Sequence, residues 1–136
     1  MQKSSSAEKK RIFWDGEEVP GLIDVQEMKL TKATIKVPGF KRLRTISSNI
    51  IEIPVLELKY KVEKGTSTMK FFETFFFTEQ CKDCTEVRVD QYDNEIQRRL
   101  WPQCECIDKV DSPYRAENPE LMVVTIQVAP WDIISL

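Results

Sequence analysis

Alternation of apolar and polar residues dominates this chain and predicts a protein built mainly of antiparallel β-strands. The clearest case is the stretch EVRVDQYDNEIQRRLWP, residues 86–102. Val87 and Val89 alternate there with charged residues, which is typical of a half-buried strand. Asp93-Asn94 tolerates the positive φ of a tight turn, so the stretch predicts a β-hairpin.

The same period of two predicts further strands elsewhere. They lie at residues 12–14, 22–25, 31–37, 50–62 and 120–128. Pro54 makes the first half of the 50–62 segment an edge or a bulge, because proline cannot donate to a strand ladder. Two polar stretches without a clear period, residues 40–49 and 109–118, are predicted as loops.

One segment has the spacing of a helix. In TSTMKFFETFFFTEQ, apolar residues recur three and four positions apart, and Thr66 or Ser67 can cap the start. We expect a helix over about residues 67–80, lying on a sheet because so many phenylalanines need cover. The fold class predicted is mainly β, an antiparallel β-sandwich or barrel subunit with one packed α-helix.

Composition fits one soluble domain. The chain has 136 residues, 41% of them hydrophobic, and a formal net charge of -2, which gives little support to sequence-reading nucleic-acid binding. No apolar run reaches the roughly 20 residues that span a bilayer, and the start of the chain does not resemble a secretory signal. We expect a flexible arm at residues 1–11, a single domain at 12–136, and synthesis in a cytoplasm.

Catalytic signals are weak. The sequence has no histidine, which removes the commonest general base and metal ligand. It lacks a nucleophile elbow, a phosphate-cradling glycine loop, an HExxH motif and a paired-carboxylate motif. The pattern therefore indicates a protein that is not an enzyme and that carries no cofactor.

The four cysteines flank the predicted hairpin. With the turn centred at Asp93-Asn94, Cys81 is expected to face Cys106, and Cys104 to face the neighbour of Cys84. Three outcomes fit this arrangement: disulfides within or between subunits, a zinc site formed by all four thiolates, or free buried thiols. A CxxC redox pair at Cys81 and Cys84 fits poorly, because it follows a helix instead of opening one.

The order of elements resembles the tail tube proteins of contractile-tailed bacteriophages, which are related to the tubes of R-type pyocins and type VI secretion. A strand, a long hairpin connection, a long strand and one helix precede the EVRVDQYDNEIQRRLWP hairpin, and LMVVTIQVAPWDII is similar to the closing strand of that family. The resemblance covers about residues 12–133. The cysteines and the phenylalanine-rich helix depart from the family pattern.

This resemblance implies hexameric rings in which strands of neighbouring subunits join into one continuous β-barrel. Stacked rings would form the inner tail tube, a channel for DNA ejection into the host. Glu86, Arg88 and Asp90 would face the lumen, and the loop with Lys41, Arg42 and Arg44 would mediate ring stacking, as would the N-terminal arm.

The implied partners are further copies of the chain, the tail sheath protein, the baseplate and terminator proteins, the tape measure protein, and DNA passing without sequence-specific binding. The implied location is the virion tail, assembled in the host cytoplasm. Two alternatives stay open at this point: a tail terminator or baseplate/spike-adaptor component, and a small zinc or redox protein built on the cysteines.

Overall fold

The computed structural model describes residues 9–39, 41–115 and 117–136, and it is mainly β with one helix. Its elements, in chain order, are β1 (Lys9–Trp14), β2 (Glu17–Glu18), β3 (Leu22–Val25), β4 (Thr31–Pro38), β5 (Leu43–Glu52), β6 (Leu56–Glu63), α2 (Ser67–Phe77), β7 (Lys82–Val89), β8 (Glu95–Arg115), β9 (Asn118–Ala129) and β10 (Ile134–Ser135). The predicted fold class is confirmed.

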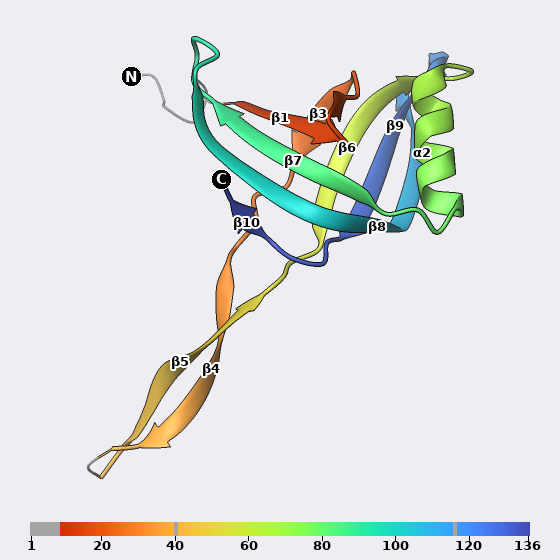
Figure 1. The fold of residues 1–136 in the computed structure, drawn as a ribbon. Coiled ribbons are helices and arrows are strands. Elements are labelled where there is room, and N and C mark those ends of the chain that lie inside the picture. The colour runs from red at the N-terminus through yellow and green to blue at the C-terminus, as the bar shows by residue number, and fades with distance from the viewer. Residues whose placement is uncertain (1–8, 40, 116) are drawn as a thin grey trace.

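The strands form one curved sheet and one separate hairpin (Figure 1). In the curved sheet the order is β2-β1-β7-β8-β9-β6-β3, with β10 added to β8, and every pairing is antiparallel. β4 and β5 pair only with each other and project away from the body of the molecule (Figure 1).

β8 joins the two halves of the curved sheet. It is 21 residues long; its first part pairs with β7 and its second part with β9. The prediction of a loop at residues 109–118 is therefore wrong, because β8 runs to Arg115 and Lys109 pairs with Ile126. Backbone hydrogen bonds hold this strand irrespective of its polar side chains, so hydrophobic periodicity did not reveal it.

The core lies between this curved sheet and α2. In β6 the alternating residues Leu56, Leu58, Tyr60 and Val62 are all buried, as the sequence predicts. The indole N–H of Trp14 donates to the hydroxyl of Tyr60 over 3.0 Å, and both side chains are fully buried. The indole N–H of Trp14 and the hydroxyl of Tyr60 therefore satisfy each other inside the core.

α2 forms where the apolar spacing predicts a helix, although it ends earlier. Thr66 is the N-cap, and its hydroxyl accepts a hydrogen bond from the backbone N–H of Met69. Phe72 and Phe75 are buried; Phe72 packs at a tilt against Tyr60 and Phe75 packs edge-on against Trp14, with ring centroids 4.7 and 5.2 Å apart. Within the described residues, no helix has the length and apolarity to cross a membrane.

The segment predicted as a loop at residues 40–49 is mostly strand, which corrects that prediction. β5 covers Leu43–Glu52 and pairs with β4 along its length, for example Ile35 with Ile46. Ile50 and Ile51 thus belong to β5, and the long strand predicted at 50–62 begins only at Leu56. Pro54 lies in the break between β5 and β6, where a missing N–H costs no ladder bond.

The predicted arm at residues 1–11 falls partly outside the described residues. Lys9, Lys10 and Arg11 are the first residues of β1 and pair with Val89, Arg88 and Val87 of β7. The domain therefore begins earlier than residue 12.

Candidate assembly surfaces

The projecting hairpin exposes large apolar side chains. Ile35, Leu43 and Ile50 of β4 and β5 are 49%, 72% and 64% exposed, whereas the buried core lies wholly in the other elements. A two-stranded hairpin is only marginally stable by itself in water, because it has no second layer to cover its apolar residues. The hairpin therefore has the character of a surface that a partner covers.

This hairpin is also basic. Between Thr31 and Glu52 the chain carries five cationic residues and a single acidic one, Glu52, although the whole protein has a net charge of -2. Lys41, Arg42 and Arg44, the residues expected in the stacking contact, lie at and beside its tip, where the N–H of Gly39 donates to the carbonyl of Arg42. The structure brings these three residues together, and their role in stacking stays a prediction.

A groove lies where the hairpin meets the body. It has a volume of about 510 Å³ and is lined by Leu30, Thr31, Lys32, Ile51, Arg99, Ile133 and Ser135. These residues come from the base of the hairpin, where β4 begins and β5 ends, and from β8 and the segment around β10. The walls of this groove are mostly apolar and include the side chains of Lys32 and Arg99, so the groove offers apolar surface that a partner can bury.

Glu86 lies on the opposite face of β7 from the one predicted. It is 7% exposed. Its cross-strand partner Ile12 of β1 and nearby Trp101 of β8 both belong to the buried core. The indole N–H of Trp101 and the Nζ of Lys10 donate to its two carboxylate oxygens at 3.2 and 3.0 Å. These two partners satisfy a buried charge, so the expectation of a water-facing Glu86 is wrong for the subunit.

Arg88 and Asp90 have structural contacts as well. The Arg88 guanidinium lies 3.4 Å from Glu27, which also pairs with Lys10, so both cations attach the segment after β3 to the sheet. Asp90 accepts hydrogen bonds from the N–H groups of Tyr92 and Asn94 in the β7–β8 turn. The Asn94 N–H is the main reason that the pKa of Asp90 lies below its usual value. A lumen-facing role for Arg88 and Asp90 stays a prediction.

The β7–β8 hairpin is confirmed, but in a register different from the expected one. Thr85 pairs with Leu100, and Cys104 pairs with Lys82, because the ladder shifts between Lys82 and Cys84 and again near Val89. Gln103 has a φ of 50°, the left-handed conformation of an irregular strand position. The expected pairing of Cys81 with Cys106 does not occur in this ladder.

The four cysteines are free thiols in the structure. Cys84, Cys104 and Cys106 are buried, whereas Cys81 is exposed. Among the described residues there is no group of three or more metal-binding side chains placed to hold an ion. Neither a disulfide within the chain nor a zinc site therefore has geometric support here, and the arrangement is that of four free thiols, three of them buried.

The buried thiols are also poor nucleophiles. Burial raises the pKa of Cys104 to about 12 and that of Cys106 to about 11, and it raises the pKa of Cys84 well above its ordinary value. The thiol of Cys104 donates to the carbonyl of Trp101 at 3.2 Å. A redox or nucleophilic cysteine needs an accessible thiolate, so these three residues serve as packing.

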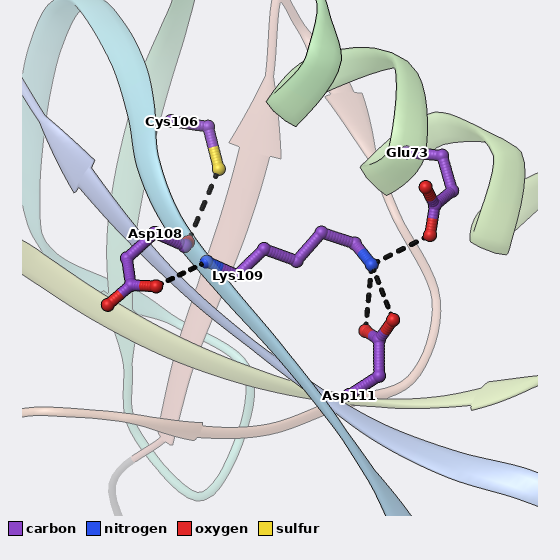
Figure 2. A network of polar contacts seen from close by, with 5 residues as sticks. All are labelled: Glu73, Cys106, Asp108, Lys109 and Asp111. Carbon is purple, nitrogen blue, oxygen red and sulfur yellow. Dashed lines mark hydrogen bonds and ion pairs between the residues drawn. The ribbon is translucent and has the colours of Figure 1, made fainter.

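A buried cation fixes the helix to β8 (Figure 2). The Nζ of Lys109, in a side chain only 6% exposed, contacts Glu73 of α2 at 2.8 Å and Asp111 of β8 at 2.7 Å. Sequence reasoning placed Lys109 in a loop and missed this cluster. The only available signal was the short spacing between Lys109 and Asp111, which does not reveal a partner 36 residues away on the helix.

Together the fold and its surfaces define a class of architecture. A curved antiparallel sheet, one helix packed against it, and a projecting two-stranded hairpin make up the described residues, and chains in solved structures of contractile injection systems share this fold. The resemblance inferred from the sequence is confirmed at the level of fold.

Individual solved structures show this likeness over nearly the whole chain. A chain in the cryo-EM structure of the PVC extracellular contractile injection system, sheath/tube terminator in extended state, has a TM-score of 0.72 at 13% identity, covering 94% of this chain and 93% of that one. A chain of the anti-feeding prophage tube terminating cap has a TM-score of 0.71 at 12% identity, covering 93% and 87%. Hcp1 from Flavobacterium johnsoniae has a TM-score of 0.60 at 10% identity, covering 93% of each chain.

Sequence comparison adds no closer relation, since no family model and no curated protein matches the chain. Identities near 10% make the shared architecture a statement about fold.

Proposed function

We propose that this protein is a structural subunit that associates with copies of itself into rings, and that these rings build the inner tube of a contractile injection apparatus or phage tail. The observation that carries the proposal is the match to a chain in the PVC sheath/tube terminator structure, over 94% of this chain and 93% of the other at a TM-score of 0.72. The match extends over nearly the whole of both chains, so the likeness is to the complete subunit and not to a shared fragment.

The surfaces support an assembling role. A basic hairpin with exposed Leu43 and Ile50 projects from the subunit, and a mostly apolar groove lies at its base. Exposed apolar residues on a monomer are a cost unless a partner buries them. We propose that Lys41, Arg42, Arg44 and their hairpin contact the adjacent ring, that sheath and baseplate proteins are further partners, and that the role is structural, not catalytic.

Negative-stain electron microscopy of the purified chain tests this function. Stacked rings of one diameter are expected, and a protein that stays monomeric at all concentrations and salt conditions contradicts the proposal. Single rings that never stack would instead indicate the terminator role, in which a ring caps the tube.

A variant with a shortened hairpin provides the matched test of stacking. Replacing residues 33–50 by a two-residue Asn-Gly turn joins Lys32 to its partner Ile51 through that turn and keeps the base pairs Thr31 with Glu52 and Lys32 with Ile51. Because the hairpin contributes no residue to the buried core, the variant should unfold at the same urea concentration as the parent. We expect it to form rings without stacks; long tubes from this variant would exclude the hairpin from the stacking contact.

A further inference from the structure

One half of the curved sheet has two outer strands, β1 and β10. β1 pairs with β7, β7 with β8, and β8 with β10, so β1 and β10 lie on opposite sides of the same group of strands (Figure 1). Each outer strand presents a row of backbone donors and acceptors that can pair with another chain.

The outer side of β1 is largely unpaired within the described part of the chain. β2 covers only Phe13 and Trp14, and the remaining residues Lys9–Ile12 pair with β7 alone. Lys9, Lys10 and Arg11 place three cations in this stretch, which discourages pairing with an arbitrary partner.

β10 continues the path of β9 along β8. Ala129 pairs with Glu105 and Ile134 pairs with Leu100, so both strands share one register on β8, interrupted after Pro130. Between them the N–H of Trp131 donates to the carbonyl of Pro102 at 3.0 Å. β10 is thus an edge strand held to β8 by backbone hydrogen bonds.

The backbone directions of β10 follow from one hydrogen bond. The N–H of Leu136 donates to the carbonyl of Arg98 at 3.0 Å, so it points toward β8. Successive N–H groups of a strand point to opposite edges, and the N–H of Ser135 therefore points away from β8. Apolar side chains flank this open edge, since Ile134 is 41%, Leu136 66% and Trp131 75% exposed.

We propose that β10 of one copy pairs with the open edge of β1 of a second copy, and that this contact is the junction between subunits of a ring. This inference rests on the proposed function, because it names the edges through which the proposed rings close. The two edges belong to opposite sides of one subunit, so the contact is head-to-tail, which closes into a ring at a suitable rotation.

Two features favour this pairing over a symmetric one. A contact of β10 with a second β10 would produce a dimer and leave both β1 edges open, whereas the head-to-tail contact covers both kinds of edge. The charges are also compatible, because the three cations of β1 pair with carboxylates of their own copy, Lys9 with Asp93, Lys10 with Glu86 and Arg11 with Glu18. Residues 131–136 carry only the charge of Asp132, so the contact buries no unpaired cluster of like charges.

A proline at the outward N–H tests the junction. Ser135→Pro removes the one donor that points to the second copy, and proline is tolerated on edge strands when its nitrogen faces away from the existing ladder. Ser135→Ala keeps the N–H and serves as the matched control. Negative-stain imaging should show loss of rings for Ser135→Pro and rings for Ser135→Ala, with circular dichroism confirming that both variants are folded.

Cross-linking provides a second test that does not depend on proline. Lys9→Cys and Ser135→Cys are combined in a Cys81→Ser background, since Cys81 is the exposed native thiol. A flexible bis-maleimide, which tolerates a range of registers between the two strands, should yield a ladder of covalent oligomers that ends at the ring size. Ser135→Cys alone should stop at dimers.

The outcomes separate the junction from the function. Rings from Ser135→Pro equal to those from Ser135→Ala, or no ladder from the double-cysteine variant while rings are present, overturn the junction and leave the tube proposal standing. Absence of rings from the parent protein and from every variant overturns both proposals.

Discussion

The Nζ of Lys109 lies 2.8 Å from Oε1 of Glu73, which links β8 to the middle of α2 (Figure 2). Burial alone would lower the pKa of Lys109, but the hydrogen bonds from its ammonium to Asp111 and Glu73 outweigh burial and raise it. The cation is buried and its two carboxylates are partly exposed, so the cost of breaking the cluster depends on which side is removed.

Removing the carboxylates should cost more than removing the cation. The double variant Glu73→Gln/Asp111→Asn leaves a buried ammonium without a counter-charge, and we expect a loss of about 2 kcal/mol in the free energy of unfolding. Lys109→Met keeps the packing and leaves both carboxylates reachable by water, so we expect a loss below about 1 kcal/mol. Urea unfolding followed by circular dichroism measures both; no loss of stability in the double variant would show that the ion cluster does not stabilise the packing of the helix on β8.

Tyr60→Phe should destabilise the protein because it leaves Trp14 without its hydrogen-bond acceptor. The substitution removes the hydroxyl that accepts from Trp14 and leaves a buried indole N–H unsatisfied, which costs about 1–3 kcal/mol. Tyr92→Phe, at a position that is 75% exposed, is the control and should leave stability unchanged. Both variants are compared by urea titration, and a Tyr60→Phe protein as stable as the parent would mean that the hydrogen bond contributes nothing net.

Alkaline pH should destabilise the protein through its buried thiols. Burial raises the pKa of Cys104 to about 12 and of Cys106 to about 11, above the ordinary thiol value of about 8.5 in an unfolded chain. A raised folded-state pKa gives stability that is fully present below the unfolded value and is lost as pH rises toward the folded one. We therefore expect urea midpoints to fall from about pH 8.5 upward.

The variant Cys104→Ala tests the source of that pH dependence. It removes one buried thiol from the titration, so the fall of the urea midpoint between about pH 8.5 and 11 should become shallower, even though the variant starts from lower stability. Cys81→Ala, at the exposed position, is the matched control and should retain the slope of the parent. An unchanged slope in Cys104→Ala would assign the effect to other groups.

A thiol reagent should distinguish the one exposed cysteine from the three buried ones. In the folded protein Cys81 is exposed, whereas Cys84, Cys104 and Cys106 are buried, so a thiol reagent should modify a single site at neutral pH. All four should react after unfolding without reductant, because none is bonded to another. Intact mass spectrometry counts the labels; fewer than four in urea would reveal a disulfide.

Periodicity of two was sufficient to predict β6, β9 and the β7–β8 hairpin, since each buries one face against the core. It predicted β4 but not its partner β5, because Leu43 to Glu52 buries no face in the core and has no apolar period. The second half of β8 was missed for a related reason. There the backbone ladder with β9 holds a polar sequence in place.

The face of β7 on which Glu86 lies and the register of the β7–β8 hairpin both depend on contacts between residues that are distant in sequence. A charged residue in an alternating strand is expected to face water, yet Glu86 is buried because Trp101 and Lys10 satisfy it from neighbouring strands. The turn centre likewise did not set the register at the cysteines, because irregular positions near Val89 and Gln103 shift the ladder. The candidate ring edges at β1 and β10 emerge only from the order of strands in space.

The length of β8 has a mechanical consequence. Since one uninterrupted strand supplies hydrogen bonds to β7 in its first part and to β9 in its second, neither half of the sheet can come apart without disturbing the other. The subunit should therefore lose its structure in one cooperative step, with indole fluorescence from buried Trp14 and Trp101 following the same curve as the amide signal. A load applied along this strand would be shared by both halves, which suits the structural role proposed above.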